Sequence, residues 1–118
     1  NMYTFYEYPK CSTCRKAKAE LDQLGLDVES INIKENPPSA QFLKELLVGS
    51  DLELKKFFNT SGQSYRSLGL KDKLPTLSLD EAVELLASDG MLIKRPILIK
   101  DGKVLQVGYR TPYQNVNL

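Results

Sequence analysis

The spacing of apolar residues in the first third of the chain predicts a strand, a helix and a second strand. Residues 3–8 are rich in aromatic and β-branched types, which is typical of a strand, and Pro9 ends this run. Residues 27–33 show a second strand pattern. Between them, four apolar residues recur at the spacing of one helix face: Cys14, Ala17, Leu21 and Leu24. A β-α-β unit of about 30 residues places its two strands parallel, with a right-handed crossover.

The middle of the chain, about residues 39–90, predicts helices only. Ser39 and Asp51 are placed to cap two of them, and short helical turns are expected over residues 65–74. The capping-box sequence at Ser78 predicts a further helix that runs to about Ser88. Four aromatic residues are interpreted as packing residues: Tyr6, Tyr8, Phe57 and Phe58.

The last part of the chain predicts a β-hairpin. Residues 96–99 form a short apolar strand that begins at a proline, and residues 104–107 form the returning strand. Asp101-Gly102 between them is a strong two-residue turn signal. The tail after Gly108 is polar and shows no clear period. The pattern therefore predicts one α/β domain over residues 1–118, with a four-stranded mixed sheet and a helical insertion between strands 2 and 3.

Composition and charge exclude several functional classes. The 118 residues are 42% apolar and 26% charged, as in ordinary globular domains. The net charge of +1 gives no general electrostatic reason to bind nucleic acid or an anionic membrane. Apolar runs are far shorter than the roughly 20 residues of a membrane-spanning helix, and an export signal is not recognisable. We therefore expect a cytoplasmic protein that binds neither nucleic acid nor membranes directly.

The absence of histidine narrows the chemistry further. Without it, Ser-His-Asp and Cys-His catalysis and every histidine-ligated metal site are excluded. Two cysteines cannot complete a cysteine-rich zinc site, so no metal is expected. Reactive groups must therefore come from cysteine, arginine, lysine, tyrosine or carboxylate side chains.

The two cysteines, Cys11 and Cys14, form a C-x-x-C motif where the first strand meets the first helix. In a protein without an export signal, such a pair is more often redox-active or metal-binding than structural. The position at a helix start and the nearby Lys10, Arg15 and Lys16 favour the Cys11 thiolate. We therefore predict a lowered pKa for Cys11 and a higher one for Cys14, and an intramolecular disulfide on mild oxidation.

The apolar helix face leaves two interpretations of Cys14 open: it is either a resolving thiol or a small core residue. A β-α-β unit with this motif, followed by a hairpin entered through a proline, has the thioredoxin-like layout. We therefore expect a single thioredoxin-like domain with its helical insertion at about residues 39–90.

Several segments together resemble the arsenate reductase (ArsC) family of the thioredoxin-like fold, including its Spx-type regulator branch. These segments are Tyr8–Ala17, Leu54–Asn59, Tyr65–Leu70, Leu92–Ile97 and Val107–Tyr109. The resemblance implies that Cys11 is the nucleophile and that a cis Arg95-Pro96 bond faces it. The predicted substrate-binding residues are Ser12, Arg15, Arg66, Arg95 and Pro96.

The resemblance implies a thiol oxidoreductase that acts on an oxyanion or a disulfide. Cys14, glutathione, glutaredoxin or thioredoxin would resolve the adduct, and no metal or organic cofactor is implied. The sequence departs from the family at two of its three arginine positions, which hold Asn59 and Val107 here. Arg66 is a candidate substitute for one of them. The alternative is a redox-sensing regulator of the Spx type, whose partner would be the RNA polymerase α subunit.

Overall fold

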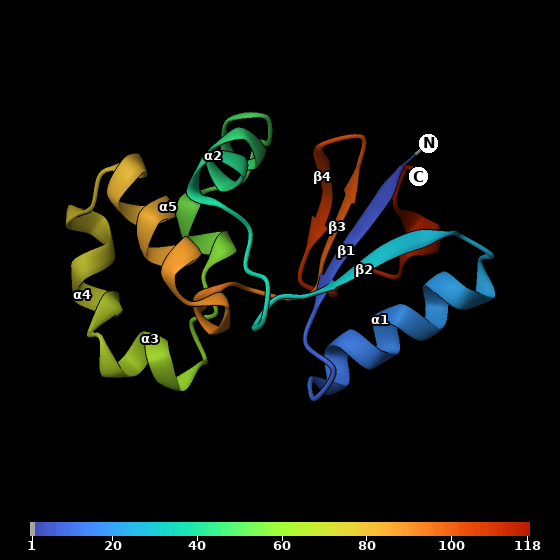
Figure 1. Ribbon diagram of the computed structural model, residues 1–118, viewed down its shortest axis with the longest axis horizontal. Helices are drawn as coiled ribbons and strands as arrows, with labels where there is room; N and C mark the ends of the chain where they lie inside the picture. Colours follow the sequence, from blue (N-terminus) through green and yellow to red (C-terminus); the bar gives the residue numbers. More distant parts are fainter. Residues whose placement is uncertain (1) are drawn as a thin grey trace. The chain divides into compact units, whose positions relative to one another are not determined.

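The computed structural model describes residues 2–118 and divides the chain into two compact units. The sheet unit comprises the residues up to Asn32 together with Arg95–Leu118. The helical unit comprises Ile33–Lys94 and corresponds to the predicted helical insertion (Figure 1). That the two units make a single domain stays a prediction.

The sheet unit contains a four-stranded mixed sheet in the order β2-β1-β3-β4. Strand β1 pairs in parallel with β2 and antiparallel with β3, which confirms the predicted β-α-β unit and the mixed sheet. Both turn residues of the β3–β4 hairpin, Asp101 and Gly102, have positive φ angles of 50° and 80°, as the sequence signal required. The elements of this unit are β1 (Tyr3–Glu7), α1 (Ser12–Gln23), β2 (Val28–Asn32), β3 (Ile97–Lys100), β4 (Lys103–Val107) and the 3₁₀ turn Tyr113–Asn115.

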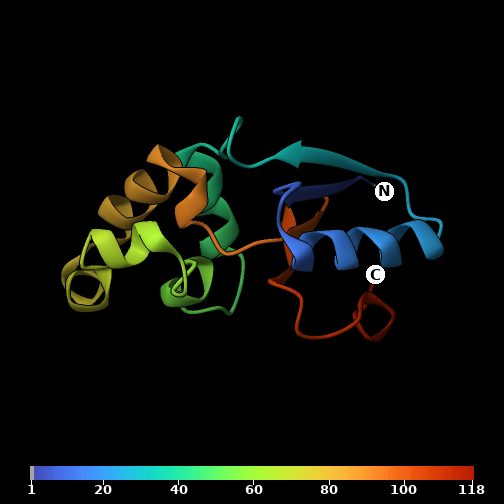
Figure 2. The ribbon, with the colours of Figure 1, turned by 90° about the horizontal axis from the view of Figure 1, so that it is seen from below.

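Helix α1 and the C-terminal segment pack on one face of this sheet (Figure 2). The buried residues of this core are Tyr3, Phe5, Ala17, Leu21, Leu98 and Tyr113. One expectation was wrong here, and one buried residue had no signal in the sequence. Leu24 is 39% exposed, because α1 ends at Gln23 and Leu24 caps it. The C-terminal tail, which shows no period, supplies the fully buried Tyr113.

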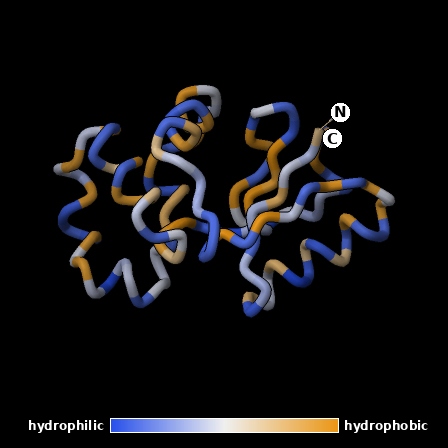
Figure 3. Tube along the Cα trace, viewed as in Figure 1, coloured by the Kyte–Doolittle hydropathy of each residue, from blue (hydrophilic) through white to orange (hydrophobic). Residues whose placement is uncertain are grey.

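The helical unit consists of short helices around an apolar centre, and hydrophobic and hydrophilic positions alternate along them (Figure 3). Its elements are α2 (Ala40–Val48), α3 (Gln63–Ser67), α4 (Leu70–Lys73), α5 (Leu79–Ser88) and the 3₁₀ turns Leu54–Phe57, Leu74–Thr76 and Gly90–Leu92. Among its largest fully buried side chains are Phe57, Phe58, Leu43, Leu46, Leu70, Leu86, Leu92 and Ile93.

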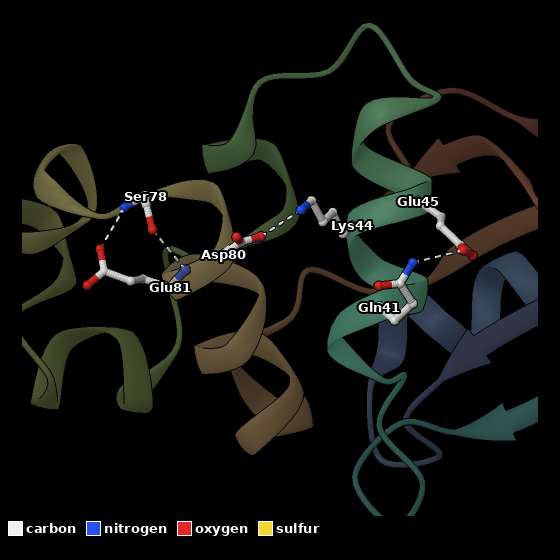
Figure 4. Close-up of polar contacts among 6 residues, drawn as sticks. All are labelled: Gln41, Lys44, Glu45, Ser78, Asp80 and Glu81. Carbon is white, nitrogen blue, oxygen red and sulfur yellow. Dashed lines mark hydrogen bonds and ion pairs between the residues drawn. The ribbon is translucent and has the colours of Figure 1, made fainter.

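Helix caps in this unit follow the sequence signals at two positions of three. Ser39 Oγ accepts the backbone N–H of Phe42 at 3.1 Å. Figure 4 shows the complete capping box of α5, in which Ser78 and Glu81 accept each other's backbone N–H. The expected cap at Asp51 was wrong, because the helical turn begins later and has no side-chain cap.

Candidate active site

The candidate nucleophile, Cys11, is the N-cap residue of α1. Its backbone N–H donates to the carbonyl of Tyr8 at 2.9 Å, closing a tight turn that places Pro9 where its fixed φ angle is favourable. The Sγ atom then accepts the backbone N–H of Cys14 at 3.3 Å. A sulfur at this position meets backbone N–H groups that have no partner within the helix. The local sequence therefore builds a site for negative charge on Cys11.

The contacts of Cys11 favour its thiolate. Burial alone raises the pKa of this thiol, but opposing contacts outweigh it and the pKa lies below the ordinary value. Those contacts are hydrogen bonds from the thiol and backbone N–H of Cys14, the positive charge of Arg95 and the backbone N–H of Thr13. The predicted lowering of the Cys11 pKa agrees with these contacts. A lower pKa favours the thiolate, which is the nucleophilic form of the side chain.

Cys14 lies three residues further along α1 and is fully buried. Burial raises its pKa to about 12, and the neighbouring Cys11 adds to the rise. A backbone hydrogen bond with Tyr8 and the charge of Arg95 oppose this only in part. Both cysteines are free thiols. The pair therefore combines one accessible, activated thiol with one protonated thiol held beside it.

Arg95 acts electrostatically on both thiols from the loop before β3. The Arg95-Pro96 bond is cis, as expected. The guanidinium carbon lies 5.4 Å from the ring centre of Tyr8, a distance at which a cation is attracted to an aromatic face. Tyr8 is thus half-buried beneath Arg95. The sequence pattern predicts only a packing role for Tyr8 and does not reveal this contact with Arg95.

The other predicted substrate-binding residues differ in their positions. Ser12 and Arg15 are exposed in the first turn of α1, and Arg15 Nη1 donates to the carbonyl of Pro9 at 3.1 Å. Pro96 is buried next to Arg95 in the sheet unit. Arg66 belongs to the helical unit and is exposed, with Nη1 donating to the Ser61 carbonyl at 3.4 Å. Its role toward Cys11 stays a prediction.

A set of contacts that the sequence did not reveal anchors the C-terminal segment to α1. Glu20 accepts the hydroxyl of Tyr109 at 2.6 Å and the backbone N–H groups of Tyr113 and Gln114 at 2.6 and 3.1 Å. Burial opposes ionisation of this carboxyl, but the three hydrogen bonds together outweigh it and hold its pKa below the ordinary value. A charged residue on a helix surface gives no sequence signal for such partners. This anchor closes the core over the helix that carries both cysteines.

Two further searches concern cofactors and membranes. Among residues 2–118, no three potential metal-ligating side chains of the His, Cys, Asp or Glu type lie close enough to hold an ion. None of the helices in that range combines the length and the apolar content that crossing a bilayer requires.

Comparisons with known proteins point to one family. The model of the ArsC family matches residues 6–112. The chain is 59% identical to the uncharacterized protein YusI of Bacillus subtilis over 91% of this chain and 90% of that protein. It is 32% identical to the global transcriptional regulator Spx of Lactiplantibacillus plantarum, covering 92% of this chain and 80% of that protein. A crystal structure described as a possible arsenate reductase from Streptococcus mutans superposes with a TM-score of 0.94 and 70% identity, covering 97% of this chain and 96% of that one.

Proposed function

Since the chain belongs to the ArsC family, we propose that it is a thiol–disulfide oxidoreductase of the arsenate reductase type. Cys11 would be its nucleophile and Cys14 its resolving thiol. The observation that carries this proposal is the pair of opposite thiol environments at the start of α1. Hydrogen bonds and the charge of Arg95 favour the thiolate of Cys11, whereas burial keeps Cys14 protonated.

With a disulfide substrate, the Cys11 thiolate attacks one sulfur of the substrate and the substrate S–S bond breaks. The departing thiolate takes up a proton, and Cys11 is left in a mixed disulfide. Cys14 then loses its proton and attacks the Cys11 sulfur, which releases the second substrate thiol. The product is a Cys11–Cys14 disulfide, so the two electrons that reduce the substrate come from this pair.

With arsenate, the Cys11 thiolate bonds to arsenic, and an arsenic-bound hydroxyl takes up a proton and leaves as water. Attack on that sulfur by Cys14 or glutathione leaves the S–As electron pair on arsenic, which is thereby reduced from As(V) to As(III). Glutathione, glutaredoxin or thioredoxin would restore the reduced protein with two electrons per turnover. A reducing cytoplasm, the location that we propose, would keep both thiols reduced between turnovers.

The negative charge of an oxyanion, or of a carboxylate on a disulfide substrate, would be held by groups already at the loop. Arg95 provides a planar cation near Cys11, and such side chains bind oxyanions through two parallel hydrogen bonds. Backbone N–H groups at the start of α1 and the first-turn residues Ser12 and Arg15 would complete the cradle. Two family arginine positions hold Asn59 and Val107, so a disulfide is the better-supported substrate.

The decisive experiment measures reduction of arsenate and of a small disulfide by the wild type beside Cys11→Ser. Glutathione with glutaredoxin, and thioredoxin with its reductase, are supplied in separate reactions. We expect activity with at least one substrate in the wild type and its complete loss in the variant. Equal rates for the two proteins, or no turnover with any donor, would refute the proposed function.

The resolving role of Cys14 has its own test. After treatment with diamide in the presence of glutathione, the wild type should lose about two mass units through an intramolecular disulfide, whereas Cys14→Ser should instead form a glutathione adduct. Cys14→Ser should also depend on external glutathione to complete each turnover. Finding only intermolecular or glutathione adducts in the wild type would remove Cys14 from the mechanism and leave Cys11 in place.

A second candidate function is redox-dependent regulation. The relative Spx, 32% identical, is a global transcriptional regulator, and the C-x-x-C pair is a feature that the sequence resemblance connects with an oxidation switch. In this function the Cys11–Cys14 disulfide would change binding to the RNA polymerase α subunit rather than transfer electrons to a substrate. Pull-down of purified α subunit by reduced and by diamide-oxidised protein discriminates the two functions. Redox-dependent capture together with absent turnover would favour the regulator.

A further inference from the structure

The helical unit contains a pocket of about 370 Å³ that the proposed thiol chemistry does not use. Its lining comes from the turn Leu54–Phe57, from α3 and α4, and from residues next to them. Figure 1 shows α3 and α4 following one another in the chain. The lining residues are Lys55, Thr60, Tyr65, Arg66, Gly69, Leu70 and Lys71. Small-molecule sites occupy about 300–1,000 Å³, so the pocket has the size of a small ligand site.

The charged residues that line this pocket are all positive. Three of its lining residues, Lys55, Arg66 and Lys71, are cationic, and no lining residue carries a carboxylate. Within residues 2–118, none of these three cations forms an ion pair, whereas Lys44 in the same unit pairs with Asp80 at 2.8 Å. Gathering three like charges without a counterion is electrostatically unfavourable, and a bound anion would relieve the repulsion.

The floor of the pocket is apolar and held in place. Tyr65 and Leu70 are buried, with exposed fractions of 6% and 1%. The Tyr65 ring packs edge-on against Phe58 with ring centres 6.3 Å apart, which restricts its rotation. Arg66 is tethered at the rim through its hydrogen bond to the carbonyl of Ser61. The hydroxyl of Thr60 adds a donor that fits an anionic oxygen.

We propose that this pocket binds a small molecule in which a phosphate or carboxylate group is attached to a ring-sized apolar body. The apolar body lies against Tyr65 and Leu70, and the anionic group meets Lys55, Arg66 and Lys71. The pocket belongs to the helical unit alone, so the proposal does not depend on the thiol chemistry of Cys11.

The test follows backbone amide signals of the full chain by NMR while phenyl phosphate or phenylacetate is added. We expect saturable shifts at Thr60, Gly69 and Lys71 and weaker binding of two partial probes, inorganic phosphate and benzyl alcohol. Added salt should weaken binding, since the cations lie at the protein surface. The tighter of the two full probes identifies the anionic group, and saturable binding of either one supports the proposal.

Matched variants separate the pocket from general surface charge. Arg66→Gln and Lys71→Gln should each weaken binding by about tenfold, the effect of losing one charge-assisted contact. Lys73 lies in α4 like Lys71 but does not line the pocket. Lys73→Gln should therefore change the affinity less than twofold. Arg95→Ala should leave the shifts in the helical unit unchanged. Absent or unsaturable shifts, or equal losses in Lys71→Gln and Lys73→Gln, would overturn the proposal.

Discussion

The sheet unit and the helical unit both attract negative charge, but they do so by different physical means. At Cys11 the charge sits on a protein sulfur, and backbone N–H groups fixed by α1 point at it. In the pocket of the helical unit the favourable groups are long, exposed lysine and arginine side chains. Fixed donors need no reorganisation when a charge develops, whereas flexible cations must be ordered first. This difference is the basis on which we propose reactivity for the first region and reversible binding for the second.

The largest expected effect contrasts the two thiols within the sheet unit. A pKa of about 12 for Cys14, against a lowered one for Cys11, makes the Cys14 thiolate population at least about 1,000-fold smaller than that of Cys11 at neutral pH. Alkylation by iodoacetamide, followed against pH on Cys14→Ser and Cys11→Ser, measures each thiol separately. The rate for Cys11 should rise at lower pH than the rate for Cys14. Coincident titration curves would show that helix position does not separate the thiols.

The next prediction tests how much of the Cys11 site depends on one side chain. Arg95→Ala should weaken phosphate or arsenate binding at the loop by roughly 10- to 150-fold through loss of a charge-assisted contact. It should also raise the pKa of Cys11, because the favourable charge is removed. Protection of Cys11 from alkylation by the added anion measures the affinity. The pH dependence of alkylation without anion measures the pKa. Arg15→Ala is the matched control. Because the Arg15 side chain is exposed, its removal should lower the anion affinity less. An unchanged affinity in Arg95→Ala would leave the backbone donors as the sole anion site.

A third prediction concerns the anchor that closes the sheet unit. Glu20→Gln should lower the free energy of unfolding by about 1–3 kcal/mol, because three donors lose a charged acceptor. The folded pKa of Glu20 is lowered, so its stabilising effect is present above the unfolded pKa of about 4.3 and is lost as the pH falls through the folded value. Urea unfolding at neutral and acid pH should show the two proteins converging at low pH. If the difference in free energy of unfolding between the two proteins were the same at both pH values, the stabilising role assigned to ionised Glu20 would be wrong.

The smallest expected effects lie in the polar contacts of the helical unit. Ser78→Ala removes one half of the capping box and should cost about 1 kcal/mol of stability. Asp80→Ala breaks the exposed ion pair with Lys44 and should cost less than about 1 kcal/mol. Thermal unfolding of both variants in the same buffer compares them directly. A larger loss in Asp80→Ala than in Ser78→Ala would show that this ion pair contributes more than its exposure indicates.

Local signals in the sequence determined much of the architecture. The aromatic and β-branched residues of the segment 3–8, the helix period that follows Cys11 and the turn Asp101-Gly102 predict the observed elements because each depends on neighbours a few residues away. The position of Cys11 at a strand-to-helix junction likewise predicted its lowered pKa. The cis Arg95-Pro96 bond was expected only through the family resemblance and not through local chemistry.

Tertiary structure alone decided which distant groups meet. The strand order that places β1 between β2 and β3 brings the loop before β3 near the start of α1, so Arg95 acts on both thiols. The tail shows no apolar period, yet Tyr113 is fully buried because its backbone N–H binds Glu20 and its ring joins the core. Such contacts depend on the path of the whole chain. Because residue spacing encodes only nearby geometry, they become visible only once the sheet is assembled.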